Sequence, residues 1–323
     1  MTSQETLHNV TDLSNSFTST HTPSDNGNST RIDHNTFTKL IEAEHLISRC
    51  VYVYSVFGLV GFLTGIFIFV IYGRNYRQKK KFEQLDIILF SLTVADFTLI
   101  LFSLTDVVRP EAVFTTALGC GVLSFFFNVP YFYTGYTHIM IFLLVSNRLA
   151  LVRKVLNKWF FSIMAAMSLS IFFSILVTAL TGVGQDASTS VNCHVDPLEA
   201  PAEYGIVKLI FGFLIPTLII LGFILQDFRK RVCPHWIFLA LVTVTFICRL
   251  IYNILLLRRQ QLLKKQSALP ELMVHVTIGE LVMFSGSCLC LVCIAVFHKM
   301  KKETMYSVTE PTEGSMPTET TTP

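Results

Sequence analysis

The sequence predicts an all-α membrane protein, a bundle of seven transmembrane helices with its N-terminus outside the cell. Of its 323 residues, 52% are hydrophobic and only 15% are charged, which is unusual for a soluble chain of this size. Seven runs are each close to the roughly 20 apolar residues that a helix needs to cross the hydrocarbon core. An odd number of spans places the two termini on opposite sides of the membrane.

We expect one helix for each apolar run. The runs cover residues 51–72, 87–105, 120–152, 160–182, 205–227, 236–257 and 272–297. No apolar stretch before the first run is long enough for a signal peptide, so the first span should act as the insertion signal.

Three regions follow from these spans. Residues 1–50, rich in Thr, Ser and Asn, should form an extracellular, disordered and glycosylated tail, with acceptor sequons at Asn9 and Asn28. Such sequons also occur by chance in a segment of this composition. Residues 51–297 form the seven-transmembrane domain, and residues 298–323 should form a disordered cytoplasmic tail.

Lys and Arg residues indicate the orientation, because cytoplasmic loops carry their excess. The segments after spans one, three, five and seven hold more of them than the outer segments, where we count Lys208. An exception is the outer segment 258–265, Arg-Arg-Gln-Gln-Leu-Leu-Lys-Lys. It could pair with the acidic outer loop before it, face solvent, or receive an acidic partner.

Three of the eight cysteines lie on the expected outer side, where disulfides form. Cys120 opens the third span and Cys193 lies in the loop between spans four and five, so one bridge would tie this loop over the bundle. Cys50 is then either free or paired between chains. The sequence has no metal-ligand spacing, and we expect neither a metal nor a cofactor.

Several spans carry motifs. Residues 92–97 read Leu-Thr-Val-Ala-Asp-Phe, 211–216 read Phe-Gly-Phe-Leu-Ile-Pro, and 246–253 read Phe-Ile-Cys-Arg-Leu-Ile-Tyr-Asn. The third span ends in Asn147-Arg148-Leu149. In these motifs the chain resembles a rhodopsin-class (class A) G-protein-coupled receptor, nearest to the chemokine receptors, over about residues 50–300.

The chain departs from that family at its switching positions. Asn147-Arg148-Leu149 stands for Asp-Arg-Tyr, and Arg249 replaces the tryptophan of span six. Residues 290–294 read Cys-Leu-Val-Cys-Ile where the family has Asn-Pro-x-x-Tyr. Losing the carboxylate beside the arginine removes a pair worth roughly 1 kcal/mol, which could raise the active population several-fold. This drift is similar to that of gammaherpesvirus-encoded chemokine-receptor-like proteins, which often signal without ligand.

Charged groups within the membrane cost about 2.5–3.5 kcal/mol each at a helix centre, so they need a partner or a role. The resemblance places Asp96 at a sodium-site position, and we hypothesise an Asp96–Arg249 ion pair; a static pair that only offsets the insertion cost is the alternative. Glu280 falls where chemokine receptors have a glutamate that meets basic ligands, or it pairs with Arg249 or a loop lysine.

One histidine lies at a family switch position. The resemblance places His138 against Pro216 and Thr245, in the core-switch triad of the family. A lone buried histidine is also commonly a hydrogen-bonded packing residue, so both interpretations stand.

The resemblance implies a receptor in the host plasma membrane that couples to a heterotrimeric G protein, with Gi favoured and Asn147, Arg148 and Leu149 at the coupling surface. Its basic inner loops would attract anionic membrane lipids. A chemokine, or no ligand at all, would act from outside, with a role in viral immune modulation. The alternative is a non-signalling scaffold that diverts host surface proteins such as MHC class I.

Other classes of function lack support in the sequence. Neither His-Glu-x-x-His nor Gly-x-Ser-x-Gly occurs, so we expect no enzyme. The seven unlike spans show no internal repeat of the kind that transporters use. Nucleic acid is not an expected partner.

Overall fold

The computed structural model describes residues 34–78, 83–108, 113–146, 159–180, 190–193, 202–229, 236–263 and 269–309. The chain divides into two compact units, Met1–Leu40 and Ile41–Pro323. Only residues 34–40 of the first unit are described, and they are helical. The bundle lies in the second unit.

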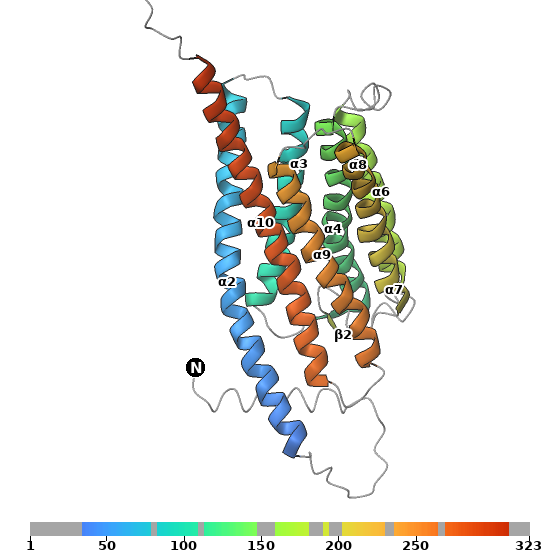
Figure 1. Cartoon of the computed structure of the whole chain (residues 1–323). Coiled ribbons are helices and arrows are strands. Elements are labelled where there is room, and N and C mark those ends of the chain that lie inside the picture. Colours follow the sequence, from blue (N-terminus) through green and yellow to red (C-terminus); the bar gives the residue numbers. More distant parts are fainter. Residues whose placement is uncertain are drawn as a thin grey trace, which may run out of the picture. The chain divides into compact units, whose positions relative to one another are not determined.

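Long helices dominate the second unit (Figure 1). In chain order they are α2 (His34–Arg77), α3 (Gln84–Val108), α4 (Ala117–Ser146), α6 (Trp159–Leu180), α7 (Ala202–Val207), the π-helix η1 (Lys208–Leu214), α8 (Ile215–Arg229), α9 (Trp236–Leu263) and α10 (Leu269–Thr309). Because α7, η1 and α8 follow one another without interruption, the described residues form seven helical rods. The predicted seven-helix bundle is confirmed; the outside position of the N-terminus stays a prediction.

A short two-stranded sheet, which the sequence did not predict, accompanies the helices. Strands β1 (Val113–Thr116) and β2 (Ser190–Cys193) pair antiparallel, with Val113 opposite Cys193 and Thr116 opposite Ser190. Both strands contact α4. The segment before α4 and the segment before α7 are thereby joined at one end of the bundle.

Two helices extend beyond the predicted domain boundaries. Helix α2 begins at His34, so residues 34–50 are helical although the sequence predicted disorder there, and α10 continues past residue 297 to Thr309. Neither extension contains Gly or Pro, and a helix that has already formed propagates readily through such residues. The sequons at Asn9 and Asn28 and residues 310–323 lie outside the described residues.

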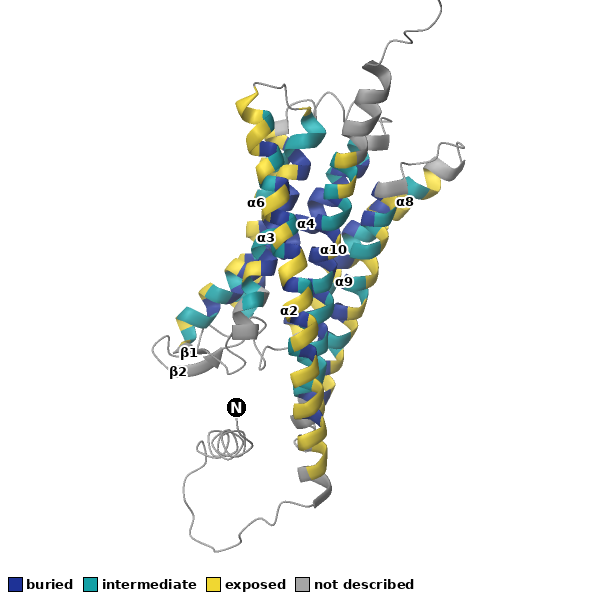
Figure 2. Ribbon diagram, turned by 90° about the vertical axis from the view of Figure 1, so that its left-hand side faces the viewer, coloured by how far each residue is buried: buried dark blue, intermediate teal, exposed yellow. Residues whose placement is uncertain are grey.

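Among the described residues, six segments are long and apolar enough to cross a membrane: Ile41–Arg77, Gln84–Phe102, Phe160–Leu180, Glu203–Gln226, Phe238–Arg259 and Glu271–Lys299. Helix α4 is the seventh rod and is not among them. All residues from 131 to 139 are buried, and Figure 2 shows buried positions along α4 and exposed ones along α2. A helix enclosed by protein can carry polar side chains without exposing them to lipid.

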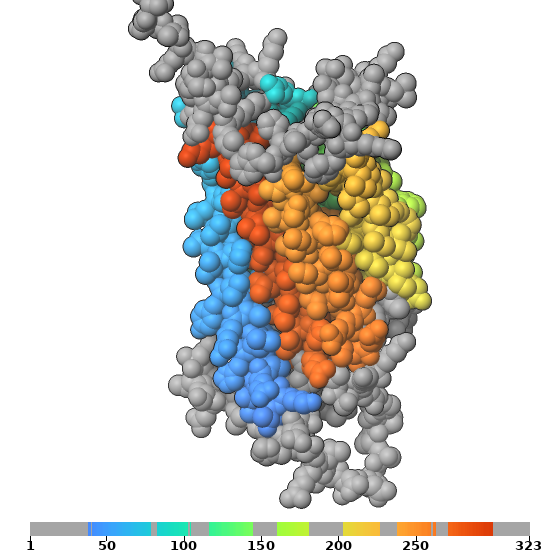
Figure 3. All heavy atoms as spheres, viewed as in Figure 1, coloured from blue at the N-terminus to red at the C-terminus, as the bar shows by residue number. Residues whose placement is uncertain are grey.

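The outward faces of the outer helices are apolar. Large apolar side chains are strongly exposed on α2 and α6, among them Leu59, Val70, Phe172 and Ile175. Figure 3 shows α9 between α10 and the α7–η1–α8 helix on one face of the molecule. Continuous apolar faces of this kind suit contact with lipid chains rather than with water.

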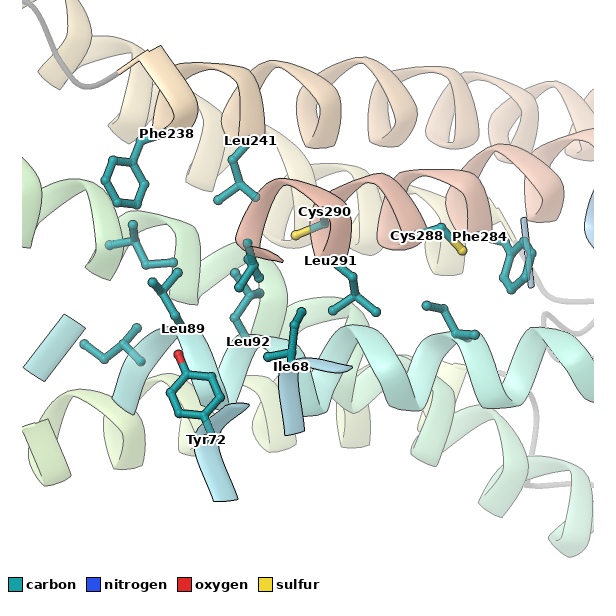
Figure 4. Close-up of a cluster of buried hydrophobic side chains, with 14 of the residues drawn as sticks. Ile68, Tyr72, Leu89, Leu92, Phe238, Leu241, Phe284, Cys288, Cys290 and Leu291 are labelled. Carbon is teal, nitrogen blue, oxygen red and sulfur yellow. The ribbon is translucent and has the colours of Figure 1, made fainter. Parts of the chain in front are cut away.

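One hydrophobic core lies between α2, α3, α9 and α10 (Figure 4). Small residues allow the helices to approach closely there. A Cβ added at Gly61 would lie 2.5 Å from the Cys288 sulfur, and one added at Gly65 would overlap the ring of Phe97. At one end of this core, the Tyr72 hydroxyl donates to the carbonyl of Asp86 at 2.9 Å.

Candidate functional site

The helix α7–η1–α8 contains a break in its regular hydrogen bonding. The backbone N–H of Ile215 bonds to the carbonyl of Ile210, five residues back, so the Phe211 carbonyl loses the partner that an α-helix would supply. Pro216 has no N–H to offer the carbonyl of Gly212. Two backbone carbonyls inside the bundle therefore need donors from other helices.

Two side chains supply those donors. The Tyr136 hydroxyl on α4 donates to the Phe211 carbonyl at 3.0 Å, and Arg249 Nη1 on α9 donates to the Gly212 carbonyl at 3.0 Å. Glycine at position 212 is required by close packing, since an added Cβ would lie 2.5 Å from Cε1 of Tyr131. The irregular helix is thus bonded to both α4 and α9.

Arg249 joins three helices. In addition to its bond to η1, its Nη2 donates to the carbonyl of Tyr131 at 2.7 Å and to the hydroxyl of Thr134, both on α4. Its guanidinium carbon lies 4.7 Å from the centre of the Tyr131 ring, which is a cation–π distance. The side chain is only 5% exposed. Charge-assisted bonds to carbonyls thus satisfy a cation that lies within the apolar span of α9.

Lys208, counted from the sequence among the outer charges, is also a buried cation. It is 0% exposed, and its Nζ donates to the hydroxyls of Tyr252 at 2.7 Å and Tyr204 at 3.4 Å. The rings of Phe127, Tyr131, Tyr204 and Tyr252 surround it, with centres 4.7 to 5.2 Å away. One feature of the sequence could have indicated this burial: Tyr204 lies one helical turn before Lys208 and can therefore face it. Tyr131 therefore contacts both Arg249 and Lys208.

Two cavities adjoin Arg249. The larger, of about 210 Å³, lies between η1–α8 and α9 and is lined mainly by apolar side chains. The smaller, of about 20 Å³, is lined by residues of α3, α4, α9 and α10, Asp96 among them. Arg249, His138 and Thr245 line both cavities. The smaller one has room for about one water molecule.

The direct Asp96–Arg249 ion pair does not form. Both side chains line the smaller cavity, but no ion pair within 4.0 Å joins Arg249 to a carboxylate among the described residues. The reason is competition from the carbonyls of α4 and η1, which the sequence pattern alone does not reveal. For the same reason the alternative pair of Arg249 with Glu280 is absent, and Glu280 lines neither cavity.

His138 lies where the resemblance placed it. Its Nε2 is 3.3 Å from the hydroxyl of Thr245, and its Nδ1 contacts the carbonyl of Thr134. Pro216 lines the same larger cavity. The expected neighbours are therefore present, and a switching role stays a prediction.

The remaining predicted site residues are described only in part. Asn147, Arg148 and Leu149 lie outside the described residues. Cys120 is disulfide-bonded, whereas Cys50 is buried and free. Cys193 is the last residue of β2, a strand that contacts α4; its pairing with Cys120 stays a prediction. Among the described residues, no group of three metal-ligating side chains occurs.

The N-terminal part of the chain is similar to a family of seven-transmembrane receptors. The model of the family described as taste receptor protein (TAS2R) matches residues 41–134, which include most of α2, all of α3 and the first part of α4. No curated protein matches the chain. The predicted likeness to chemokine receptors and the viral origin gain no support from this match. Together, the apolar helices and the match support a multi-pass membrane protein of the general G-protein-coupled receptor type.

Proposed function

We propose that this chain is a G-protein-coupled receptor that signals through Gi, and that Arg249 holds its resting arrangement. The bonds of Arg249 to carbonyls on α4 and η1 are the observation that carries the proposal. In receptors of the class that the sequence resembles, the sixth span moves outward on activation. Movement of α9 away from α4 would have to break these bonds.

The energies involved are of the right size for a switch. A hydrogen bond to a charged group contributes about 1.5–3 kcal/mol to stability, and Arg249 makes three such bonds across helices. Moving a population from mostly resting to mostly active takes about 5.5 kcal/mol. The three hydrogen bonds of Arg249 could therefore supply a large part of the free-energy difference that favours the resting arrangement.

The proposed coupling surface is Asn147, Arg148 and Leu149, at the end of the third span. The residue immediately before Arg148 is Asn147 and not an acidic residue. The ion pair that restrains this arginine in the family that the chain resembles therefore cannot form. We expect activity without ligand for this reason. The chemokine-like part of the proposal rests on the motifs at 92–97, 211–216 and 246–253, and the viral and immune-modulating parts rest on the departures at 147–149, 249 and 290–294.

The proposed topology has the N-terminus outside the plasma membrane, with glycans at Asn9 and Asn28 and a disulfide between Cys120 and Cys193. The contact of β2 with α4 supports this pairing. Removal of N-linked glycans with an endoglycosidase should increase the gel mobility of wild type but not of a double Asn9→Gln and Asn28→Gln variant. Equal mobility before and after treatment of wild type would contradict the glycosylated tail.

The test of signalling is ligand-free Gαi activation in cells that express wild type or Arg148→Ala at matched surface levels. We expect activity above background in wild type and its loss in the variant. Background activity in both would reject constitutive signalling and favour the non-signalling scaffold, whose bound surface proteins could then be identified by cross-linking.

A further inference from the structure

The larger cavity, of about 210 Å³, lies between two membrane-spanning segments. Side chains of η1 and α8 form one wall and those of α9 the other, while Gly135 and His138 of α4 close its inner end. Leu221 and Leu239 line it and are also 46% and 36% exposed. The seam between these helices lies on the face seen in Figure 3. An opening between apolar side chains of two membrane helices faces lipid, so its occupant would come from the bilayer.

One charged side chain, that of Arg249, lines this apolar cavity. Arg249 lies near the middle of the apolar segment Phe238–Arg259, so half of the roughly 30 Å hydrocarbon core separates it from either surface. A guanidinium has about five N–H donors, and the bonds to Tyr131, Thr134 and Gly212 use three. No carboxylate of the described residues contacts it directly. Donor capacity therefore remains for one acceptor group, preferably one with negative charge.

These features select one class of molecule. We infer that the cavity binds a medium-chain free fatty acid, with its alkyl chain between α8 and α9 and its carboxyl group at Arg249. A phospholipid does not fit, because its phosphate stays at the membrane surface and its two chains exceed a cavity smaller than the roughly 300–1,000 Å³ of ordinary ligand sites. A fatty acid reaches the middle of the bilayer in its neutral form and has a single chain.

Binding of a fatty acid would affect the hydrogen bond between Arg249 and the Gly212 carbonyl. The carboxyl group competes with the Gly212 carbonyl for the guanidinium, and the chain inserts between the two helices that this bond joins. A bound fatty acid would therefore loosen α9 from η1 and raise Gαi activation. This consequence rests on the proposed function, whereas the binding itself does not.

The experiment uses full-length protein purified into phosphatidylcholine nanodiscs, with a decanoic acid that carries a photoreactive diazirine and an alkyne tag. We expect cross-links to concentrate on cavity residues such as Ile220 and Leu221, and unlabelled decanoic acid to compete them away. Val242→Trp fills the cavity and should lower labelling about tenfold, since it prevents burial of the alkyl chain. The matched control is Leu218→Trp, on α8 and 62% exposed but outside the cavity, which should label as wild type does.

Several results would overturn the inference. Cross-links spread evenly over all lipid-facing helices, or unchanged labelling of Val242→Trp, would show ordinary lipid contact. If Val242→Trp does not fold, Leu221→Phe narrows the cavity from its exposed wall and replaces it. Decanol should compete about tenfold less well than decanoic acid; equal competition would reject the carboxyl contact with Arg249. Competition by phosphatidylglycerol as strong as that by decanoic acid would identify a phospholipid instead.

Signalling is measured separately, as Gαi activation by the same preparations. Specific labelling without any change in activation would contradict the proposed function and leave the binding site standing. Activation by decanoic acid without labelling of the cavity would contradict the site and leave the receptor function standing.

Discussion

The two halves of the bundle are built differently. Between α2, α3 and α10, apolar side chains pack around small residues such as Gly61 and Gly65. Between α4, η1 and α9, the packing includes two buried cations, an irregular helix and the larger cavity. Close-packed apolar side chains favour a single arrangement of the helices, whereas hydrogen bonds between helices can be replaced by hydrogen bonds to other partners. The first half therefore suits a scaffold and the second suits a switch.

The family match follows the same division. It covers residues 41–134, and so contains most of α2, all of α3 and α4 as far as Thr134. The residues that make the second half unusual, Lys208, Pro216 and Arg249, all lie beyond it. The match thus covers most of the apolar half and only the α4 side of the polar centre, with Tyr131 and Thr134.

The largest expected effect is on the scaffold half, from Gly65→Leu. The new side chain would collide with the ring of Phe97 where α2 meets α3, and overpacking of this kind costs about 3 kcal/mol or more. We expect loss of surface expression and a lower midpoint of thermal unfolding. Gly73→Leu on the same helix is the control, because an added Cβ meets nothing within 4 Å there. Equal surface levels for both variants would contradict the tight packing of α2 on α3.

The next effect is on the switch half, from Arg249→Leu. The variant leaves the Gly212 carbonyl without its donor from Arg249, at a cost of about 1–3 kcal/mol for an unsatisfied group, whereas the Tyr131 carbonyl keeps the Thr134 hydroxyl as a donor. The loss is partly offset because a buried charge is removed. We expect Gαi activation without ligand to rise several-fold at matched surface level. Arg258→Leu, an exposed position on the same helix, is the control. Unchanged basal activity in Arg249→Leu would refute the proposal that Arg249 holds the resting arrangement.

A smaller effect is expected from Gly212→Ala. The added Cβ would lie 2.5 Å from Tyr131 and push η1 away from α4, with a loss of about 1–3 kcal/mol in the free energy of unfolding. Gly222→Ala, where the added Cβ meets nothing within 4 Å, should leave stability the same or slightly higher, since alanine is the better helix former. Thermal unfolding in nanodiscs measures both variants. A loss at 222 as large as at 212 would mean that the close approach of η1 to α4 is not what requires glycine.

The sequence predicted the scaffold far better than the switch. Span number and approximate limits follow from apolar runs, because lipid imposes a length on each helix. The partners of Arg249 did not follow, because two of them are backbone carbonyls, of Gly212 and Tyr131, and a backbone acceptor is not visible in the residue type. The burial of Lys208 did not follow for a related reason. Its four surrounding rings come from three helical rods, and residues that meet only after folding cannot be read from local composition.

The smallest expected effect tests whether the released carbonyls matter individually. Tyr136→Phe removes only the hydroxyl that donates to the Phe211 carbonyl, while the ring keeps its stacking on Phe173. A buried acceptor left unsatisfied should cost about 1 kcal/mol or slightly more, and basal Gαi activation should rise less than in Arg249→Leu. Thr98→Val removes a hydroxyl that bonds only within its own helix and should change neither quantity. If Tyr136→Phe behaved like Thr98→Val, Phe211 would not need this donor, and Arg249 alone would join the irregular helix to its neighbours.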